Sequence, residues 1–109
     1  MLKQKKEQLR TEGKSVFLCN FITENPNTNF MVLMGEAIGS SINPGMKIID
    51  PNGIEYIIEE VFAESKGQVD RSEVPEETRG TTIGFKKENW DKKTYETFKK
   101  NNMIVFELR

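Results

Sequence analysis

The stretch "IIDPNGIEY", residues 48–56, constrains the fold more than any other part of the chain. Two apolar, β-branched segments flank Asp50-Pro51-Asn52-Gly53. Pro51 presets the φ angle of a type I turn, the Asp50 carboxylate can accept from backbone amides ahead of it, and Gly53 tolerates a positive φ. The pattern therefore predicts a β-hairpin with a short loop and a glycine bulge.

Other segments have the composition of strands. Runs rich in β-branched and aromatic residues are separated by turn-forming clusters such as "ENPNTN" and "GSSINPG". The one clear helical signal is "ENWDKKTYETFKKNN", which Asn89 or Asp91 could cap and Asn101 or Asn102 could end in a left-handed conformation. We expect strands over residues 15–23, 30–38, 46–50, 53–63, 81–85 and 103–108.

These elements predict an all-β chain: a small closed or partly open antiparallel β-barrel with one short helix near the C-terminus. A chain of 109 residues is long enough for one domain with a real core and too short to expect two. Residues 1–14 hold few aliphatic side chains. We interpret them as a flexible or short helical segment that precedes a single β-barrel domain over residues 15–109.

The composition limits the classes of function. Histidine is absent, which removes the commonest general base and most zinc and iron sites. A single cysteine, Cys19, excludes an internal disulfide and a cysteine-rich zinc site, and we expect no metal or cofactor. The formal net charge of −1 gives no general attraction to nucleic acid. With neither a secretory signal nor an apolar run long enough to span a bilayer, we expect a cytoplasmic protein without membrane association.

Glycines and aliphatic residues are regularly spaced in "GEAIGSSINPGMKI", residues 35–48. This spacing resembles the signature G-x-V-x-x-G-x-[IL]-x-x-G-[DE]-x-[VI] of the β-barrel second domain of translational GTPases of the elongation factor Tu type. The later stretches "RGTTIGF" and "FKKNNMIVFEL" are similar to two further strands of that barrel. The resemblance extends over residues 16–108 and implies a stand-alone barrel of the translation-factor domain 2 type.

In that family the barrel contacts the aminoacyl end of transfer RNA or ribosomal RNA, so the resemblance implies a scaffold for RNA or protein contacts. The chain departs from the family pattern where Gly39 stands one position early and where Met46 and Thr81 replace acidic residues. Residues 87–101 are also longer than the family's loop. The chain has no complete phosphate-loop motif, so we expect no GTPase activity.

Five residues have expected structural roles at turns or bulges. Gly35 lies inside an apolar strand, where a missing side chain permits a bulge or a tight bend at a barrel corner. Gly45 belongs to a chain reversal, Pro51 and Gly53 belong to the hairpin turn, and Gly80 relieves a turn before a strand.

Lysine pairs alternate with aromatic residues near the C-terminus. Between residues 86 and 100, six lysines stand against three acidic residues, and Trp90, Tyr95 and Phe98 lie among them. This composition is typical of a patch that contacts nucleic acid. The alternative, which the near-neutral net charge and the scarcity of arginine favour, is an amphipathic helix whose aromatic side chains seal a barrel end. The candidate binding residues are Lys86, Lys87, Trp90, Lys92, Lys93, Lys99 and Lys100.

We therefore expect a non-catalytic binding module that contacts RNA or a protein partner. The candidate binding surfaces are the basic segment over residues 86–100 and the loop over residues 64–79. Two alternatives stay open: a structural or accessory subunit that binds protein through strand edges, and a small enzyme that uses carboxylates. The oligomeric state is also left open.

Overall fold

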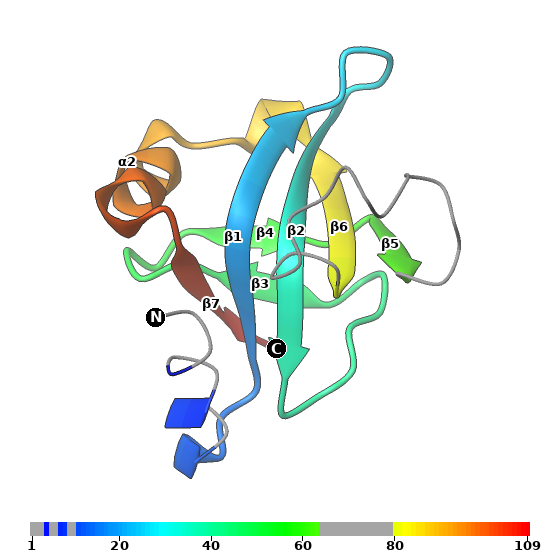
Figure 1. Cartoon of the computed structure of the whole chain (residues 1–109). Helices are drawn as coiled ribbons and strands as arrows, with labels where there is room; N and C mark the ends of the chain where they lie inside the picture. Colours follow the sequence, from blue (N-terminus) through cyan, green and yellow to red (C-terminus); the bar gives the residue numbers. More distant parts are fainter. Residues whose placement is uncertain (1–3, 5–6, 9–10, 64–79) are drawn as a thin grey trace.

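The computed structural model of the chain describes residues 4, 7–8, 11–63 and 80–109. The described elements are β1 (Val16–Glu24), β2 (Phe30–Ile38), β3 (Lys47–Ile49), β4 (Glu55–Ile57), β5 (Glu60–Ala63), β6 (Thr81–Lys86), the 3-10 turn η4 (Lys87–Asn89), α2 (Lys92–Asn101) and β7 (Ile104–Leu108). In the described part, seven antiparallel strands form one sheet in the order β4-β3-β7-β1-β2-β6-β5. The sheet is strongly curled, and α2 lies beside β7 (Figure 1).

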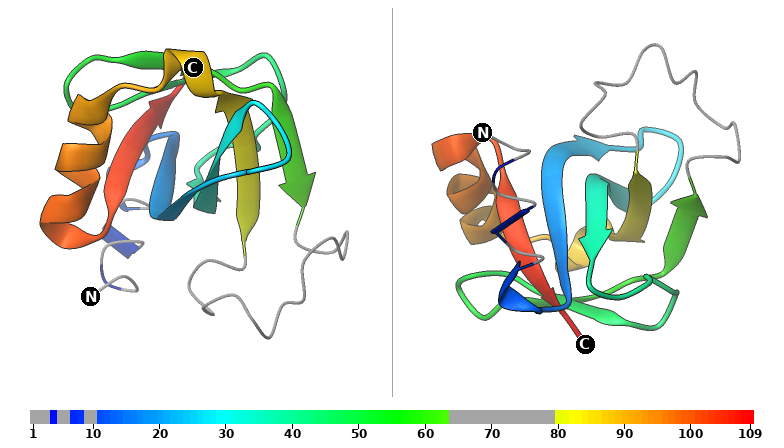
Figure 2. Two further views of the ribbon diagram at one scale, coloured as in Figure 1. Left: turned by 90° about the horizontal axis from the view of Figure 1, so that it is seen from above. Right: turned by 60° about the horizontal axis from the view of Figure 1, so that its bottom comes forward.

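The two outermost strands, β4 and β5, are consecutive in the chain and are joined only by Ile58 and Glu59. The Ile58 N–H donates to the Met46 carbonyl at 2.9 Å, beside β3, and the Glu59 N–H donates to the Gly84 carbonyl at 2.9 Å, within β6. One bent run of chain therefore bonds to both ends of the curled sheet, which forms a small, partly open barrel (Figure 2).

The predicted all-β barrel with a short helix near the C-terminus is confirmed. The strand expected over residues 53–63 is wrong as a single element, because the chain bends between β4 and β5 to pass from one ladder to the other. No helix in the described ranges is both long enough and apolar enough to cross a membrane.

The predicted hairpin is also confirmed, since β3 pairs with β4. The Gly53 N–H donates to the Asp50 carbonyl at 3.0 Å, the Asp50 N–H donates to the Ile54 carbonyl at 2.9 Å, and Gly53 has a φ of 87°. One carboxylate oxygen of Asp50, Oδ1, accepts the backbone N–H groups of Asn52 and Ile54, both at 2.8 Å. Its other oxygen, Oδ2, remains available for contacts outside the turn.

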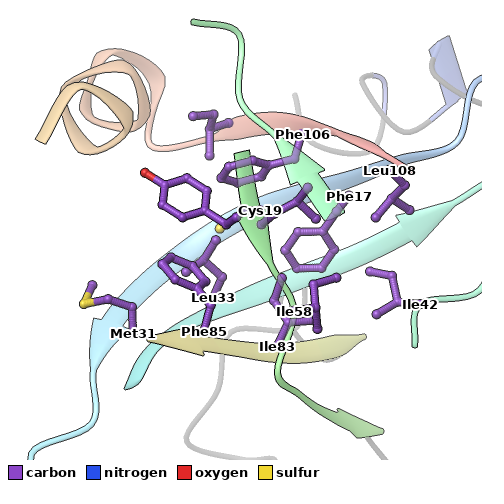
Figure 3. Packing of buried hydrophobic residues seen from close by; sticks show 13 residues of the cluster. Phe17, Cys19, Met31, Leu33, Ile42, Ile58, Ile83, Phe85, Phe106 and Leu108 are labelled. Carbon is purple, nitrogen blue, oxygen red and sulfur yellow. The ribbon is translucent and has the colours of Figure 1, made fainter. Parts of the chain in front are cut away.

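Side chains that point into the barrel form the main core (Figure 3). Ile42, in the connection between β2 and β3, joins this core and is buried. Val16, Leu18 and Ile38 form a second, smaller cluster, which Met103 and Val105 flank. The fully buried members of the main core include Phe17, Cys19, Leu33, Ile48, Ile83, Phe85 and Phe106, each 0% exposed.

Gly35 lies at a close contact between β2 and the backbone of β1. It faces Cys19, and the pairing register of β1 shifts between Cys19 and Phe21, as a bulge requires. A Cβ atom on Gly35 would stand 1.9 Å from the Leu18 carbonyl oxygen. Only glycine fits this position without a shift of the backbone.

The other turn residues singled out from the sequence lie in connections. Gly45 has a φ of 94° in the reversal before β3, and Pro51 is exposed in the hairpin turn. Gly80 stands directly before β6, where an added Cβ would lie 2.6 Å from the Gly35 carbonyl oxygen.

Candidate binding surface on helix α2

Helix α2 begins and ends with local caps. The Asp91 side chain accepts the Lys93 N–H at 2.8 Å, and Asn102 adopts a left-handed conformation with a φ of 54°. The Asn102 N–H donates to the Phe98 carbonyl. Of the caps left open by the sequence, the chain uses Asp91 and Asn102.

A chain of buried hydroxyl groups fixes α2 to the hairpin. Thr94 is 0% exposed, and its hydroxyl donates to Oδ2 of Asp50 at 2.6 Å. Because that bond uses the single hydroxyl hydrogen of Thr94, the Tyr56 hydroxyl donates to Thr94 Oγ1, at 2.7 Å. The Asp91 N–H in turn donates to the Tyr56 oxygen at 3.2 Å. The carboxylate of Asp50 is therefore the final acceptor of a directed hydrogen-bond chain.

A second link joins the hairpin turn to the helix. The side-chain amide nitrogen of Asn52 donates to Thr97 Oγ1 at 3.0 Å and to Oδ2 of Asp50 at 3.3 Å. Asp50, only 4% exposed, thus accepts four hydrogen bonds through its carboxylate. These four hydrogen bonds give Asp50 a structural role, because they join the hairpin turn to α2.

The aromatic side chains around α2 divide between the core and the surface. The Trp90 ring lies 5.9 Å from that of Tyr56 and 5.8 Å from that of Phe85, and both Trp90 and Phe98 pack against the core. Tyr95 stacks on Phe98 at 6.2 Å but remains 41% exposed. Trp90 and Phe98 therefore seal the barrel, whereas Tyr95 belongs to the surface.

Four of the candidate lysines share one exposed side of α2. At about 3.6 residues per turn, Lys92, Lys93, Lys99 and Lys100 project to the side opposite buried Thr94, with Glu96 among them. We call these four lysines the lysine face. Within the described part of the chain none of them forms an ion pair, and the Lys99 ammonium lies 5.1 Å above the Tyr95 ring.

The first turn of α2 contains Lys92 and Lys93 and no acidic residue. The N-terminus of a helix carries partial positive charge, so two ammonium groups there oppose the helix dipole. The Asp91 carboxylate at the cap offsets part of this effect, and Lys99 and Lys100 in the last turn are placed favourably for the dipole.

The remaining two candidate lysines lie outside the helix and are paired. Lys86 Nζ is 3.8 Å from a carboxylate oxygen of Glu59, and Lys87 Nζ is 2.9 Å from one of Glu24. The structure therefore brings four of the six candidate lysines together without an ion pair to any residue that it describes, and it places the other two beside glutamates.

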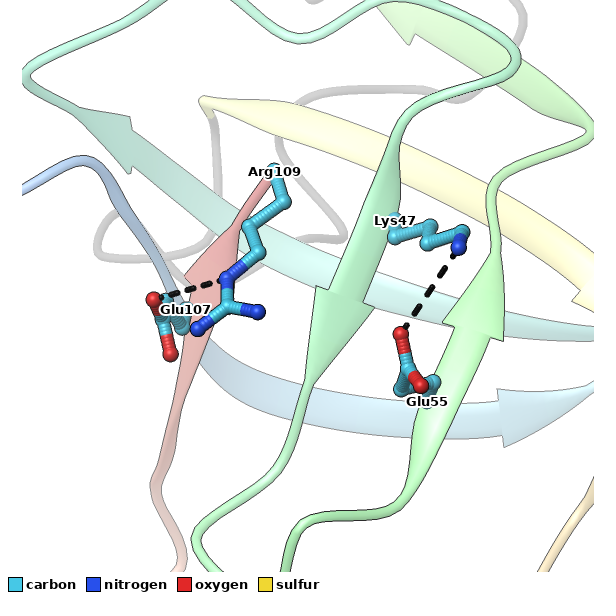
Figure 4. Close-up of polar contacts among 4 residues, drawn as sticks. All are labelled: Lys47, Glu55, Glu107 and Arg109. Carbon is cyan, nitrogen blue, oxygen red and sulfur yellow. Dashed lines mark hydrogen bonds and ion pairs between the residues drawn. The ribbon is translucent and has the colours of Figure 1, made fainter.

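Charges on the outer side of β3, β4 and β7 are also matched (Figure 4). Lys47 Nζ lies 3.9 Å from Glu55, and Arg109 Nε lies 3.0 Å from Glu107. Exposed pairs of this kind contribute little to stability, but they leave no local excess of either sign. The lysine face differs from this region because its charges have no ion-pair partner among the described residues.

An open groove of about 740 Å³ runs beside β7. Its charged lining includes Glu12, Lys14 and Glu107, together with the carboxylate of Asp50. This mixture of signs favours no particular class of ligand.

The thiol of Cys19 and the side chain of Tyr56 are buried. Burial raises the pKa of the Cys19 thiol to about 12, so the thiol is neutral and inert at physiological pH. Burial is also the main cause that raises the pKa of the Tyr56 hydroxyl. In the portion of the chain that the structure describes, no group of three or more Cys, Asp or Glu side chains could hold a metal ion.

Sequence reasoning missed Thr94 and the contacts of Asn52 with the helix. Thr94 stands between lysines and a tyrosine, and nothing local marks it as buried. The only available signal was its position opposite the lysines on a helical projection. The loop over residues 64–79, which the sequence nominated as a second surface, lies outside the described residues.

The fold and the site together define a small antiparallel β-barrel that carries an exposed lysine face on one helix, with no ion pair to this face from the residues that the structure describes. Comparison of the chain with family models, curated proteins and solved structures finds no match. The resemblance to the barrel of translational GTPases therefore stays a prediction from the sequence.

Proposed function

We propose that this chain is a non-catalytic, cytoplasmic binding module whose lysine face contacts RNA. The proposal depends on one observation: four lysines share an exposed helix face beside the exposed ring of Tyr95, and none of them forms an ion pair with a described residue. Lysines that neutralise phosphates release counterions, and an aromatic ring offers a stacking surface for an unpaired base. The resemblance to translation-factor barrels supports the same class of partner.

The chemistry of the face predicts the kind of binding. Lysine is a point charge without the planar fork with which arginine recognises phosphates and bases. Contacts to phosphates position the backbone but do not read the sequence. We therefore expect binding with low sequence preference and a strong dependence on salt concentration.

The test is fluorescence anisotropy with a labelled single-stranded RNA of mixed sequence over a range of salt concentrations. Replacing Lys92, Lys93, Lys99 and Lys100 by Gln should reduce the slope of log affinity against log salt by about three units, because four single-strand phosphate contacts are lost. The matched control replaces Lys3, Lys5, Lys14 and Lys47 by Gln, which removes the same charge outside residues 86–100. If the two variants bind RNA equally well or equally poorly, the lysine face is not the contact surface.

A second candidate function is a structural or accessory subunit that binds protein through its sheet. One row of outward-facing cross-strand partners supports it: Phe21 faces Met34, Met34 faces Thr82, and Thr82 faces Phe62. Phe21 and Phe62 are 39% and 37% exposed. A defined homo-oligomer in light scattering, dissociated by Phe21→Ser and Phe62→Ser and unable to shift labelled RNA at low salt, would favour this function over RNA binding.

A further inference from the structure

Asn52 is the only asparagine in the sequence that a glycine follows. Because Gly53 lacks a side chain, its backbone nitrogen can approach the Asn52 carboxamide with little steric hindrance. Both residues are exposed in the hairpin turn. Asparagine is among the thermolabile residues, and an exposed Asn-Gly pair is the most reactive context for it.

We propose that Asn52 is a site of spontaneous deamidation, and that its modification weakens the attachment of α2 to the barrel. The backbone nitrogen of Gly53 attacks Cγ of Asn52 and loses its proton, while the side-chain nitrogen leaves as ammonia. Water then opens the cyclic imide at one of its two carbonyl carbons. The products are aspartate and isoaspartate, and solvent water is the only co-reactant.

The carboxamide is a structural link that the product cannot replace. The Asn52 nitrogen donates both to Oδ2 of Asp50 and to Oγ1 of Thr97. A carboxylate has no hydrogen to donate, so both bonds are lost. The Thr97 hydroxyl cannot reverse the second bond while it donates to the Lys93 carbonyl at 3.0 Å.

The new carboxylate also opposes the buried one. The side-chain nitrogen of Asn52, which leaves in the reaction, is 3.3 Å from Oδ2 of Asp50, so an oxygen in its place would put two carboxylates in contact. Like charges at this separation cannot both remain ionised without a rise in free energy. Oδ2 of Asp50 is also the acceptor for Thr94, and the repulsion therefore acts on both links between hairpin and helix.

The isoaspartate product has a further effect. It routes the main chain through the former side chain and lengthens it by one carbon atom. The turn in which Asp50 accepts the backbone N–H groups of Asn52 and Ile54 cannot persist with this backbone. We expect α2 to open locally more often, while the interior of the barrel keeps its packing.

The turn itself slows the reaction. The Gly53 N–H donates to the Asp50 carbonyl at 3.0 Å, and this bond must break before the nitrogen can attack. The folded chain should therefore deamidate more slowly than a free peptide of residues 48–56, but at Asn52 before any other asparagine. This inference concerns the attachment of α2 and holds whatever the lysine face binds.

The first experiment incubates the intact chain in mildly alkaline buffer and maps its peptides by mass spectrometry, with an isoaspartyl methyltransferase to detect isoaspartate. The free peptide serves as the reference. Aspartate and isoaspartate at Asn52, ahead of every other asparagine, are the expected result. An unchanged Asn52 after the free peptide has fully reacted would overturn the proposal.

The second experiment measures amide hydrogen exchange in Asn52→Asp, which carries one of the two products. We expect exchange in α2 about tenfold faster than in the unmodified chain, with β1, β2 and β7 unchanged. Asn27→Asp, in the exposed turn between β1 and β2, is the matched control and should leave α2 unaffected. Equal exchange of α2 in the two variants, or an increase spread over the whole barrel, would refute the proposed effect.

Discussion

Asp50 has two roles, one local and one distant. Its Oδ1 atom completes the hairpin turn, and its Oδ2 atom receives the hydroxyl of Thr94, 44 residues further along the chain. The local role follows from Asp-Pro-Asn-Gly turn chemistry and could be predicted. The distant role could not, because only the folded barrel brings α2 over the turn. The lysine face was visible in the sequence, whereas the residues that hold it in place were not.

Thr94→Val should destabilise the chain by about 1–3 kcal/mol, because Oδ2 of Asp50 and the hydroxyl of Tyr56 would lose a buried partner. Valine matches threonine in size, so lost packing contributes little. Thr23→Val, at an exposed position of β1, is the control and should change stability by less than about 0.5 kcal/mol. Denaturant unfolding of both variants provides the measurement. Equal midpoints would show that the hydroxyl chain does not anchor the helix.

At the scale of single elements, sequence patterns predicted most strands within a residue or two. The strand expected over residues 30–38 has the same bounds in β2, and the hairpin follows its turn residues. The failure was the run over residues 53–63, where a continuous apolar and acidic pattern contains a bend. The chain bends there because it passes from the ladder with β3 to the ladder with β6. The sequence of residues 53–63 alone does not show which strands pair with it.

Gly35→Ala tests the close backbone contact between β1 and β2. Its Cβ would stand 1.9 Å from the Leu18 carbonyl oxygen and 2.8 Å from Cys19 Cα, so β1 and β2 must separate. We expect a loss of about 1–3 kcal/mol or more. Gly84→Ala is the control, because a Cβ there would have its nearest neighbour at 3.7 Å. Thermal unfolding that ranks the two variants equally would contradict the proposed close contact.

At the scale of the whole molecule, closure of the barrel depends on Ile58 and Glu59, the short run of chain that joins β4 to β5. Ile58 belongs to neither strand, yet it bonds to the chain beside β3 and its side chain is 1% exposed in the core. Its neighbour Ile57 points outward and is 53% exposed. Barrel closure therefore combines backbone pairing and apolar burial in the same residue.

Replacing each of these adjacent isoleucines by alanine separates the two environments. Ile58→Ala should cost about 2–5 kcal/mol, because it leaves a cavity at the closure. Ile57→Ala removes the same atoms from the surface and should cost less than about 0.5 kcal/mol. The free energies of unfolding from urea titrations give the comparison. Similar losses for both would mean that closure does not depend on Ile58.

The position of β7 between β1 and β3 has a consequence for how the chain acquires its structure. β1 pairs on one side with β2, which follows it directly, and on the other with β7, which follows only after all the other strands. During synthesis, the β1–β2 hairpin can form early, but its second edge has no partner until β7 has emerged from the ribosome. Contacts this distant in sequence slow folding, and the unpaired edge of β1 is meanwhile open to association with other nascent chains.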